Sequence, residues 1–224
     1  MFSIMFSALL YKVGEILIKS YAKCMLKMDI RHKAELPLGP VLYAANHPST
    51  TDPIFMHLVS PSPLSVMITS KVFSIPVLGA YMRRMQQIAV VPGQGERVLE
   101  EARQMLARGR SVMIFPEGLI SPPGDFHAPR SGVARLALKA GVPVVPLGIS
   151  LREENCKRVP TVLDGEPDVI TWYLRGPYAV TIGKPLWFQG DADDRSLVKT
   201  IAETVMQQIR DLARESRQRV FLSN

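Results

Sequence analysis

The sequence lacks the features that define several classes of protein. It has only two cysteines, Cys24 and Cys156, which are too few and too far apart for a disulfide framework or a closely spaced metal site. No uninterrupted apolar run reaches about 18 residues, so a simple transmembrane span is not expected. The N-terminus has neither the basic start nor the small-residue cleavage site of a signal peptide. We therefore expect reducing surroundings that face the cytosol.

Acidic side chains are also in short supply, because 27 Lys and Arg residues stand against 20 Asp and Glu residues and give a net charge of +7. Such a chain favours an anionic surface or substrate. No aromatic-basic cluster, zinc-finger spacing or RNA-binding signature is present, so nucleic acid is not an expected partner. A membrane surface or a phosphate-bearing substrate fits the charge better.

Residues 1–28 contain no proline and one glycine, which predicts a helix, and residues 1–11 are almost wholly apolar. In the turns that follow, at about 100° per residue, lysines share one stripe and apolar residues share the opposite one. The lysine stripe is Lys12, Lys19, Lys23 and Lys27; the apolar stripe is Val13, Leu17, Tyr21, Cys24 and Met28, with Ile16 and Leu26 in neither. The pattern is typical of an interfacial membrane helix. The alternative is an amphipathic helix that packs on the protein's own core.

Apolar runs that suit buried strands alternate with helical spacing along the rest of the chain. The strand candidates are residues 41–45, 64–69, 87–91, 112–115, 142–149, 169–174 and 178–182. The helix candidates are residues 53–59, 75–84, 96–108, 131–139 and 196–216, while residues 152–168 are charged and irregular. This alternation predicts an α/β fold with a mostly parallel (mixed) central sheet flanked by helices. That single domain would span residues 36–224, after N-terminal membrane-associating helices within residues 1–35.

The strand predicted at residues 41–45 ends abruptly in a polar turn that carries Asn46, His47 and Asp52. Open α/β sheets place their ligands at the carboxyl ends of such strands. Histidine is suited to moving a proton near neutral pH, and a nearby carboxylate could fix its tautomer and stabilise the imidazolium. The alternative is that Asp52 caps a helix and His47 is a surface residue.

The strand predicted at residues 112–115 ends in a second unusual turn, Pro116-Glu117-Gly118. If the two strands are parallel neighbours, both turns open onto one crevice. The chain has no Gly-x-Ser-x-Gly elbow and no cysteine in a nucleophile motif. We therefore expect the histidine to activate a hydroxyl of the substrate, which is the logic of direct acyl transfer.

These residues resemble the motifs of the glycerolipid acyltransferases, whose best-known members acylate 1-acylglycerol 3-phosphate. Asn46-His47-Pro48-x-x-x-Asp52 is similar to the family's His-x4-Asp motif, and Phe115-Pro116-Glu117-Gly118 is similar to its Phe-Pro-Glu-Gly motif. Two weaker blocks lie in the expected order between and after them: Ser70-Lys71 with Ile75, Pro76 and Gly79, and the proline-bearing strand at residues 142–148. The resemblance covers roughly residues 40–150.

The resemblance implies transfer of a fatty acyl group from an acyl-CoA or acyl carrier protein thioester to a hydroxyl of a lyso-lipid, without metal or bound cofactor. It implies that His47 is the general base and Asp52 its orienting partner. Residues five apart on a regular helix lie about 140° apart, so the turn near Pro48 must be non-helical. The substrate-binding candidates are Asn46, Lys71, Arg83, Arg84, Phe115, Pro116, Glu117, Gly118, Arg130 and Pro146. The enzyme would be a peripheral or monotopic protein on the cytoplasmic face of the cell membrane.

The sequence departs from the family at two phosphate-binding positions. After Phe-Pro-Glu-Gly the family usually continues Thr-Arg-Ser, whereas this chain has Leu119, Ile120 and Ser121. The third strand usually ends with an arginine, and that position here is Pro92. Arg83, Arg84 or Arg130 could substitute. Alternatively the acceptor carries no glycerol phosphate, being a lyso-aminolipid or a glycolipid, or the chain is a non-catalytic lipid-binding relative.

Overall fold

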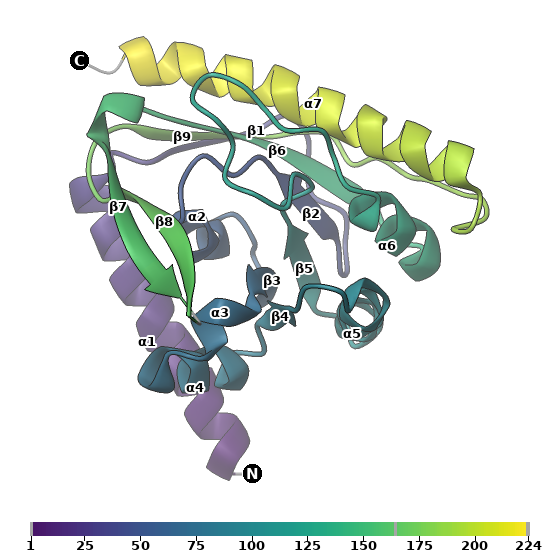
Figure 1. Ribbon diagram of the computed structural model, residues 1–224, viewed down its shortest axis with the longest axis horizontal. Helices are drawn as coiled ribbons and strands as arrows, with labels where there is room; N and C mark the ends of the chain where they lie inside the picture. Colours follow the sequence, from purple (N-terminus) through teal and green to yellow (C-terminus); the bar gives the residue numbers. More distant parts are fainter. Residues whose placement is uncertain (1, 164, 223–224) are drawn as a thin grey trace.

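One seven-stranded sheet organises the protein, which a computed structural model describes over residues 2–163 and 165–222 (Figure 1). Its strands are β1 (Asp29–His32), β2 (Leu42–Ala45), β3 (Leu64–Thr69), β4 (Ile88–Val90), β5 (Ser111–Ile114), β6 (Val144–Leu151) and β9 (Tyr178–Ile182). They lie in the order β1-β9-β6-β2-β5-β3-β4, and only the pairing of β6 with β9 is antiparallel. The predicted fold class, an α/β domain with a mostly parallel, mixed sheet, is confirmed.

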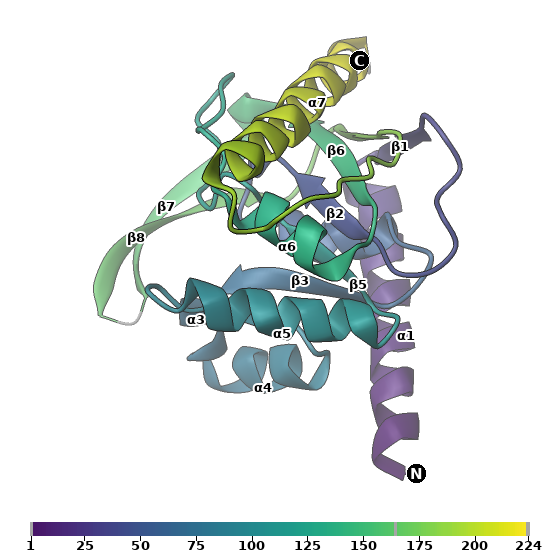
Figure 2. The same ribbon diagram turned by 90° about the vertical axis from the view of Figure 1, so that its right-hand side faces the viewer.

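Helices cover both faces of the sheet (Figures 1 and 2). They are α1 (Phe2–Met25), α2 (Asp52–Phe55), α3 (Ser70–Phe73), α4 (Pro76–Arg84), α5 (Gly95–Ala107), α6 (Gly132–Ala140) and α7 (Arg195–Leu222), with short 3₁₀ turns η1 (Met56–Leu58) and η2 (Glu153–Asn155). Successive side chains of a strand point to opposite faces. In β2, Tyr43 and Ala45 join the core under α1 and α2, whereas Leu42 and Ala44 join the core under α5, α6 and α7.

The long C-terminal helix α7 packs closely on β6 because Gly148 has no side chain. A Cβ atom at Gly148 would lie 2.0 Å from the backbone nitrogen of Ala213. The Ser216 hydroxyl donates a hydrogen bond of 2.8 Å to the Gly148 carbonyl. The helix begins at a cap, where Asp194 Oδ1 accepts hydrogen bonds from the backbone N–H groups of Ser196 and Leu197.

The structure contains two strand regions that differ from the sequence prediction. The prediction that residues 152–168 are irregular is wrong, because β7 (Cys156–Leu163) and β8 (Glu166–Tyr173) pair as an antiparallel hairpin apart from the main sheet. Charged residues and Pro160 obscured the strand pattern there. Strand β1 was not predicted, and it pairs with β9 in parallel at one edge of the sheet. The hairpin stands out from the body of the protein in Figure 2.

The helix predicted over residues 1–28 is confirmed as α1, and the side of it that packs on the core coincides only in part with the apolar stripe of the sequence pattern. Its buried side chains are Ala22 and Leu26, with Ile18 and Tyr21 packed against the same core. Val13 and Leu17 point to solvent instead. The second half of α1 therefore packs on the protein's own core. The side chains of residues 1–12, which carry the apolar start, lie outside the described residues. Within the described part of the chain, no helix combines the length and apolar character needed to cross a membrane.

Candidate active site

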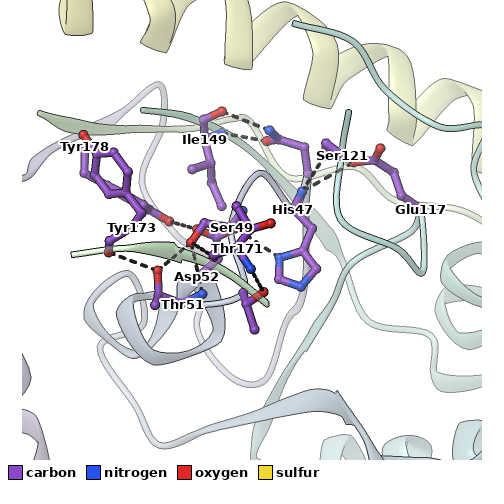
Figure 3. A network of polar contacts seen from close by, with 12 residues as sticks. His47, Ser49, Thr51, Asp52, Glu117, Ser121, Ile149, Thr171, Tyr173 and Tyr178 are labelled. Atoms are coloured by element: carbon purple, nitrogen blue, oxygen red, sulfur yellow. Dashed lines mark hydrogen bonds and ion pairs between the residues drawn. The ribbon is translucent and has the colours of Figure 1, made fainter. Parts of the chain in front are cut away.

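The turn after β2 brings His47 and Asp52 into direct contact (Figure 3). Residues 46–51 are not helical, and α2 begins only at Asp52. His47 Nδ1 consequently lies 3.0 Å from Asp52 Oδ2. The expected non-helical turn near Pro48 is confirmed. β2 and β5 are parallel neighbours, so the two unusual turns meet at one edge of the sheet, as expected.

The Asp52 carboxylate is fully buried and accepts three hydrogen bonds. Its Oδ2 accepts from His47 Nδ1 and, at 2.8 Å, from the backbone N–H of Ser49. Its Oδ1 accepts from the Tyr178 hydroxyl at 2.8 Å. The alternative of a capping aspartate and a surface histidine is wrong. Asp52 is the first residue of α2 and makes no cap hydrogen bond, and the His47 side chain is only 15% exposed.

The contact with Asp52 determines which nitrogen of His47 can act as a base. A carboxylate only accepts hydrogen bonds, so Nδ1 of the neutral imidazole carries the proton and Nε2 carries the lone pair. The ring stacks on Phe115, with centroids 4.1 Å apart and planes 17° from parallel. Asp52 and Phe115 together fix the ring's orientation, and the arrangement suits proton abstraction by Nε2.

Tyr178 is a site residue that the sequence analysis missed. Burial, and then the negative charge of Asp52, raise the pKa of Tyr178 well above its ordinary value. The phenol therefore stays protonated and donates to Asp52 at any pH of interest. Tyr178 belongs to β9, far from the motif in sequence and inside an apolar run, so no local signal marks its hydroxyl.

The Phe-Pro-Glu-Gly turn holds the backbone of His47 through Ser121 and Glu117. The backbone N–H of His47 donates to Ser121 Oγ at 3.0 Å, and the His47 carbonyl accepts from the Ser121 N–H at 2.8 Å. The Ser121 hydroxyl donates in turn to Glu117 Oε1 at 2.5 Å. Glu117 is buried, and its other oxygen accepts from the backbone N–H of His127 at 2.7 Å. The two motifs therefore form one hydrogen-bonded unit.

Asn46 ties the start of the same turn to β6. Its side-chain amide donates to the Ile149 carbonyl at 2.9 Å, and its side-chain oxygen accepts from the Ile149 N–H at 2.7 Å. The side chain thus imitates one more residue of strand pairing beyond the end of β2. Asn46 lies at the site, but its polar groups face the sheet.

The β7–β8 hairpin holds the middle of the turn. The Thr50 N–H donates to the Thr171 carbonyl at 2.9 Å, and the Thr171 N–H donates to the Thr50 hydroxyl at 3.0 Å. Thr51 donates its hydroxyl to the Tyr173 carbonyl at 3.2 Å. One edge of β8 therefore lies against the His47 turn. The contacts of Thr50 with Thr171 and of Thr51 with Tyr173 were not predicted.

The other predicted site residues are spread more widely. Lys71 pairs with Asp168 of the hairpin at 3.5 Å. Arg83 and Arg84 lie in the last turn of α4, where Arg83 donates to the Phe73 carbonyl at 3.1 Å. Pro146 is buried in β6 opposite Ala44 of β2.

Arg130 lies closer to the site, because a Cβ at Gly118 would be only 2.6 Å from Arg130 Nε. Its exposed side chain therefore passes over Gly118 of the Phe-Pro-Glu-Gly turn. The backbone N–H of Arg130 also donates to the Pro116 carbonyl at 2.8 Å, which holds the segment there.

No serine or cysteine in the described ranges is hydrogen-bonded to the His47 ring. The Ser49 hydroxyl is fully buried and bonded to Thr51 and to the Thr171 carbonyl. Burial raises the pKa of Cys156 to about 11, so this thiol stays protonated at neutral pH and is a poor nucleophile. The arrangement suits a base that acts on a hydroxyl from outside the protein.

We expect Tyr178→Phe to lower kcat for the reaction of this site by roughly tenfold with KM nearly unchanged. A tenfold fall in rate corresponds to about 1.4 kcal/mol of activation free energy. The substitution removes one of the three donors to a buried carboxylate, and hydrogen bonds to charged groups contribute about 1.5–3 kcal/mol. Tyr173→Phe is the matched control, because Tyr173 is equally buried but donates to the Pro177 carbonyl. Thermal melts and steady-state kinetics of both variants make the comparison. Equal loss of kcat in the two would contradict a specific role for Tyr178.

Comparison with known proteins identifies related sequences. A family model described as Acyltransferase matches residues 27–150. The lyso-ornithine lipid O-acyltransferase of Pseudomonas aeruginosa is 30% identical over 149 residues, 65% of this chain and 57% of that protein. The 1-acyl-sn-glycerol-3-phosphate acyltransferase of the same organism is 27% identical over 54% of this chain and 49% of its own length. A chloroplast enzyme of that name from Brassica napus is 32% identical over 54% of this chain and 36% of its own length.

A solved structure supports the fold. The crystal structure of the 1-acyl-sn-glycerophosphate acyltransferase from Thermotoga maritima matches with a TM-score of 0.61 over 94% of this chain and 88% of that chain. The sequence identity is 22%, so this likeness concerns the fold alone. The chain spans about half the length of the curated relatives that it matches, at most 57%.

Proposed function

The chain belongs to the Acyltransferase family, and from that premise we propose that it transfers a fatty acyl group from a thioester donor to a hydroxyl of a lyso-lipid. The observation that carries the proposal is the His47–Asp52 contact of 3.0 Å, which leaves Nε2 as the basic nitrogen. The thioester would be an acyl-CoA or an acyl carrier protein. The names of the relatives, which acylate lyso-lipids, support the substrate class.

The proposed mechanism is direct transfer within one complex. His47 Nε2 takes the proton of the acceptor hydroxyl as the hydroxyl oxygen bonds to the thioester carbonyl carbon. The tetrahedral intermediate collapses with cleavage of the C–S bond, and the proton on Nε2 passes to the departing thiolate. Asp52 stabilises the imidazolium between these steps, and general-base catalysis of this kind typically contributes about 10²–10⁴ in rate.

Among acceptors, we favour a lysophospholipid such as 1-acylglycerol 3-phosphate. All three curated relatives described above are named as acyltransferases, and two of them are named for 1-acyl-sn-glycerol 3-phosphate as the acceptor. Arg130 is the cation best placed to bind its phosphate, because the guanidinium crosses Gly118 at the edge of the site. Lys71 is a second candidate, although its ion pair with Asp168 would have to open.

A lyso-aminolipid acceptor is the second candidate, and a specific observation supports it. Leu119 and Ile120 occupy the positions where the family usually has a threonine and a phosphate-binding arginine. The relative with 30% identity over 149 residues is named for a lyso-ornithine lipid. Either acceptor would use the same His47 chemistry.

A panel of acceptors tests the proposal. Purified protein is given one acyl-CoA and, in separate reactions, 1-acylglycerol 3-phosphate, lyso-ornithine lipid or a neutral monoacylglycerol. We expect fastest turnover with the phosphate acceptor, and we expect Arg130→Ala to raise its KM roughly tenfold, as loss of a hydrogen bond to a charged group implies. The KM for monoacylglycerol should stay unchanged, and Arg130→Lys should restore part of the affinity for the phosphate.

The panel also separates the alternatives. Turnover confined to lyso-ornithine lipid would select the second acceptor. Absence of turnover with every acceptor, from both acyl-CoA and acyl carrier protein thioesters, would contradict catalysis and indicate a lipid-binding relative.

We also propose that the protein is a peripheral or monotopic membrane protein on the cytoplasmic face, with the division between residues 1–35 and 36–224 kept as a working boundary. The apolar residues 1–11 support a membrane-directed start. Because Ala22 and Leu26 are buried in the core, a truncation that tests this must end before them. Removing residues 2–12 leaves those contacts intact.

A further inference from the structure

Helix α4 carries its apolar side chains on the side that faces away from the protein. Val77 is 85% exposed, and Leu78 and Tyr81 are also exposed. Tyr81 lies three and four positions after Leu78 and Val77, so the three side chains share one side of the helix. On the opposite side, Gly79 is buried so tightly that a Cβ would lie 2.1 Å from the Phe73 carbonyl oxygen. This polarity is the reverse of that of a helix exposed to water.

Helix α1 adds a second apolar stripe beside α4. Gly14 of α1 touches Tyr81 of α4, since a Cβ at Gly14 would lie 2.7 Å from the Tyr81 hydroxyl oxygen. Next to Gly14, Val13 is exposed, Ile16 is 62% exposed and Leu17 is 65% exposed. These three lie on the side of α1 opposite its buried residues. The exposed apolar residues of both helices form what we call the α1–α4 patch: Val13, Ile16, Leu17, Val77, Leu78 and Tyr81.

The charged side chains described at the border of the α1–α4 patch are positive, whereas the side chain of Glu15, next to Ile16 in sequence, lies outside the described residues. Exposed Arg83 and Arg84 end α4, which contains no acidic residue, and exposed Lys19 and Lys23 continue α1 beside Ile16. A contiguous exposed apolar patch marks an interaction site. Apolar side chains bordered by Lys and Arg match a leaflet with anionic headgroups.

The position of the patch agrees with a membrane as the occupant. Figures 1 and 2 both show the first half of α1 extending past α4 at the same end of the protein, with the C-terminus at the other end. Residues 2–11, which the sequence shows to be almost wholly apolar, belong to that extension. We infer that α4 is a second membrane-contacting element, which together with α1 seats the protein on an anionic lipid surface.

This placement connects the bilayer to the candidate active site. α3 directly precedes α4, and Lys71 of α3 is paired with Asp168 of the hairpin at 3.5 Å. The β8 strand of the same hairpin is bonded to Thr50 in the His47 turn. These contacts link α4, through α3 and the hairpin, to the His47 turn. The inference itself does not depend on acyl transfer, because lipid binding is measured without it.

Vesicle co-sedimentation of the full chain tests the inference. The α4 variant carries Val77→Asp and Leu78→Asp. The control is an α7 variant that carries Phe221→Asp and Leu222→Asp, two exposed apolar residues at the C-terminal end of α7. With vesicles of phosphatidylcholine and phosphatidylglycerol, we expect the α4 variant to bind at least tenfold more weakly than wild type and the α7 variant to bind like wild type. Wild-type binding should weaken as salt is raised or as phosphatidylglycerol is omitted.

Several outcomes would overturn the inference. Equal binding by wild type and the α4 variant would do so, as would equal losses in the α4 and α7 variants. The inference would also be overturned if the wild-type protein were a dimer in solution, the α4 variant were a monomer, and both bound lipid equally well. Val77→Ser with Leu78→Ser, checked by thermal melting, guards against a folding defect. Acyl transfer to a detergent-dispersed acceptor is followed separately, so loss of the proposed function is distinguishable from loss of membrane contact.

Discussion

His47→Ala should reduce kcat for acyl transfer by about 10²–10⁴-fold, since general-base catalysis contributes that much. The variant lacks the only side chain placed to take the hydroxyl proton in the proposed mechanism. The protein should still fold, because the turn is held mainly through the His47 backbone, whose N–H and carbonyl both bond to Ser121. Steady-state kinetics with one acyl-CoA and the acceptor found in the panel provide the measurement.

His32→Ala is the matched control for this variant, because His32 is exposed in β1 at the edge of the sheet. It should retain full activity. Vesicle binding and thermal melts should be unchanged in both variants. Near-wild-type turnover by His47→Ala would rule out the proposed base, whatever the acceptor.

Asp52→Asn should lower kcat by roughly 10²–10⁴-fold, the range set by losing the carboxylate behind a catalytic histidine. The amide can turn its NH₂ group toward the Tyr178 hydroxyl oxygen and still accept from His47 Nδ1, in which case only the negative charge is lost. If the NH₂ group faces His47 instead, the tautomer reverses and Nε2 carries the proton. The lower end of the range corresponds to the first case and the upper end to the second.

The Asp52→Asn result is measured as kcat and KM beside Asp125→Asn, which changes an exposed aspartate in the loop after the Phe-Pro-Glu-Gly turn. We expect the KM of Asp52→Asn to change little, because Asp52 is buried and touches no substrate. A kcat within threefold of wild type would show that Asp52 neither orients His47 nor stabilises its charged form.

The central part of the site was predictable because local chemistry determines it. The apolar runs of β2 and β5 end at polar turns, and two parallel strands necessarily bring such turns together. The five-residue separation of His47 and Asp52 required a non-helical turn, which the structure contains. The general α/β fold followed from the same alternation of strand and helix patterns.

The supporting contacts were not predictable, because they join residues far apart in sequence. Tyr178 reaches Asp52 from β9. Thr171 reaches Thr50 from a hairpin whose charges and proline concealed its strands. Nothing in the local pattern around Tyr178 or Thr171 reports a partner more than a hundred residues away. The sequence of an apolar run does not report whether a tyrosine hydroxyl within it is hydrated or is hydrogen-bonded to a catalytic carboxylate.

Helix α1 shows a different limit of pattern reading. Its two apolar stripes compete, because Ile18, Ala22 and Leu26 are spaced for one side and Val13 and Leu17 for the other. The sequence does not say which stripe the core takes. The structure buries the first and leaves the second beside α4, where Tyr81 contacts Gly14. The apolar residues of α1 that the core does not take form the α1 half of the α1–α4 patch.

The central claim is that His47 activates the acceptor itself, without an acyl-enzyme. A rapid-quench experiment with acyl-labelled CoA and stoichiometric wild-type protein, read by intact-protein mass, tests it most directly. Direct transfer predicts label that moves from CoA to the lyso-lipid with no acylated protein, and CoA release that requires the acceptor. A burst of CoA without acceptor, matched by one acyl group on the protein, would contradict it.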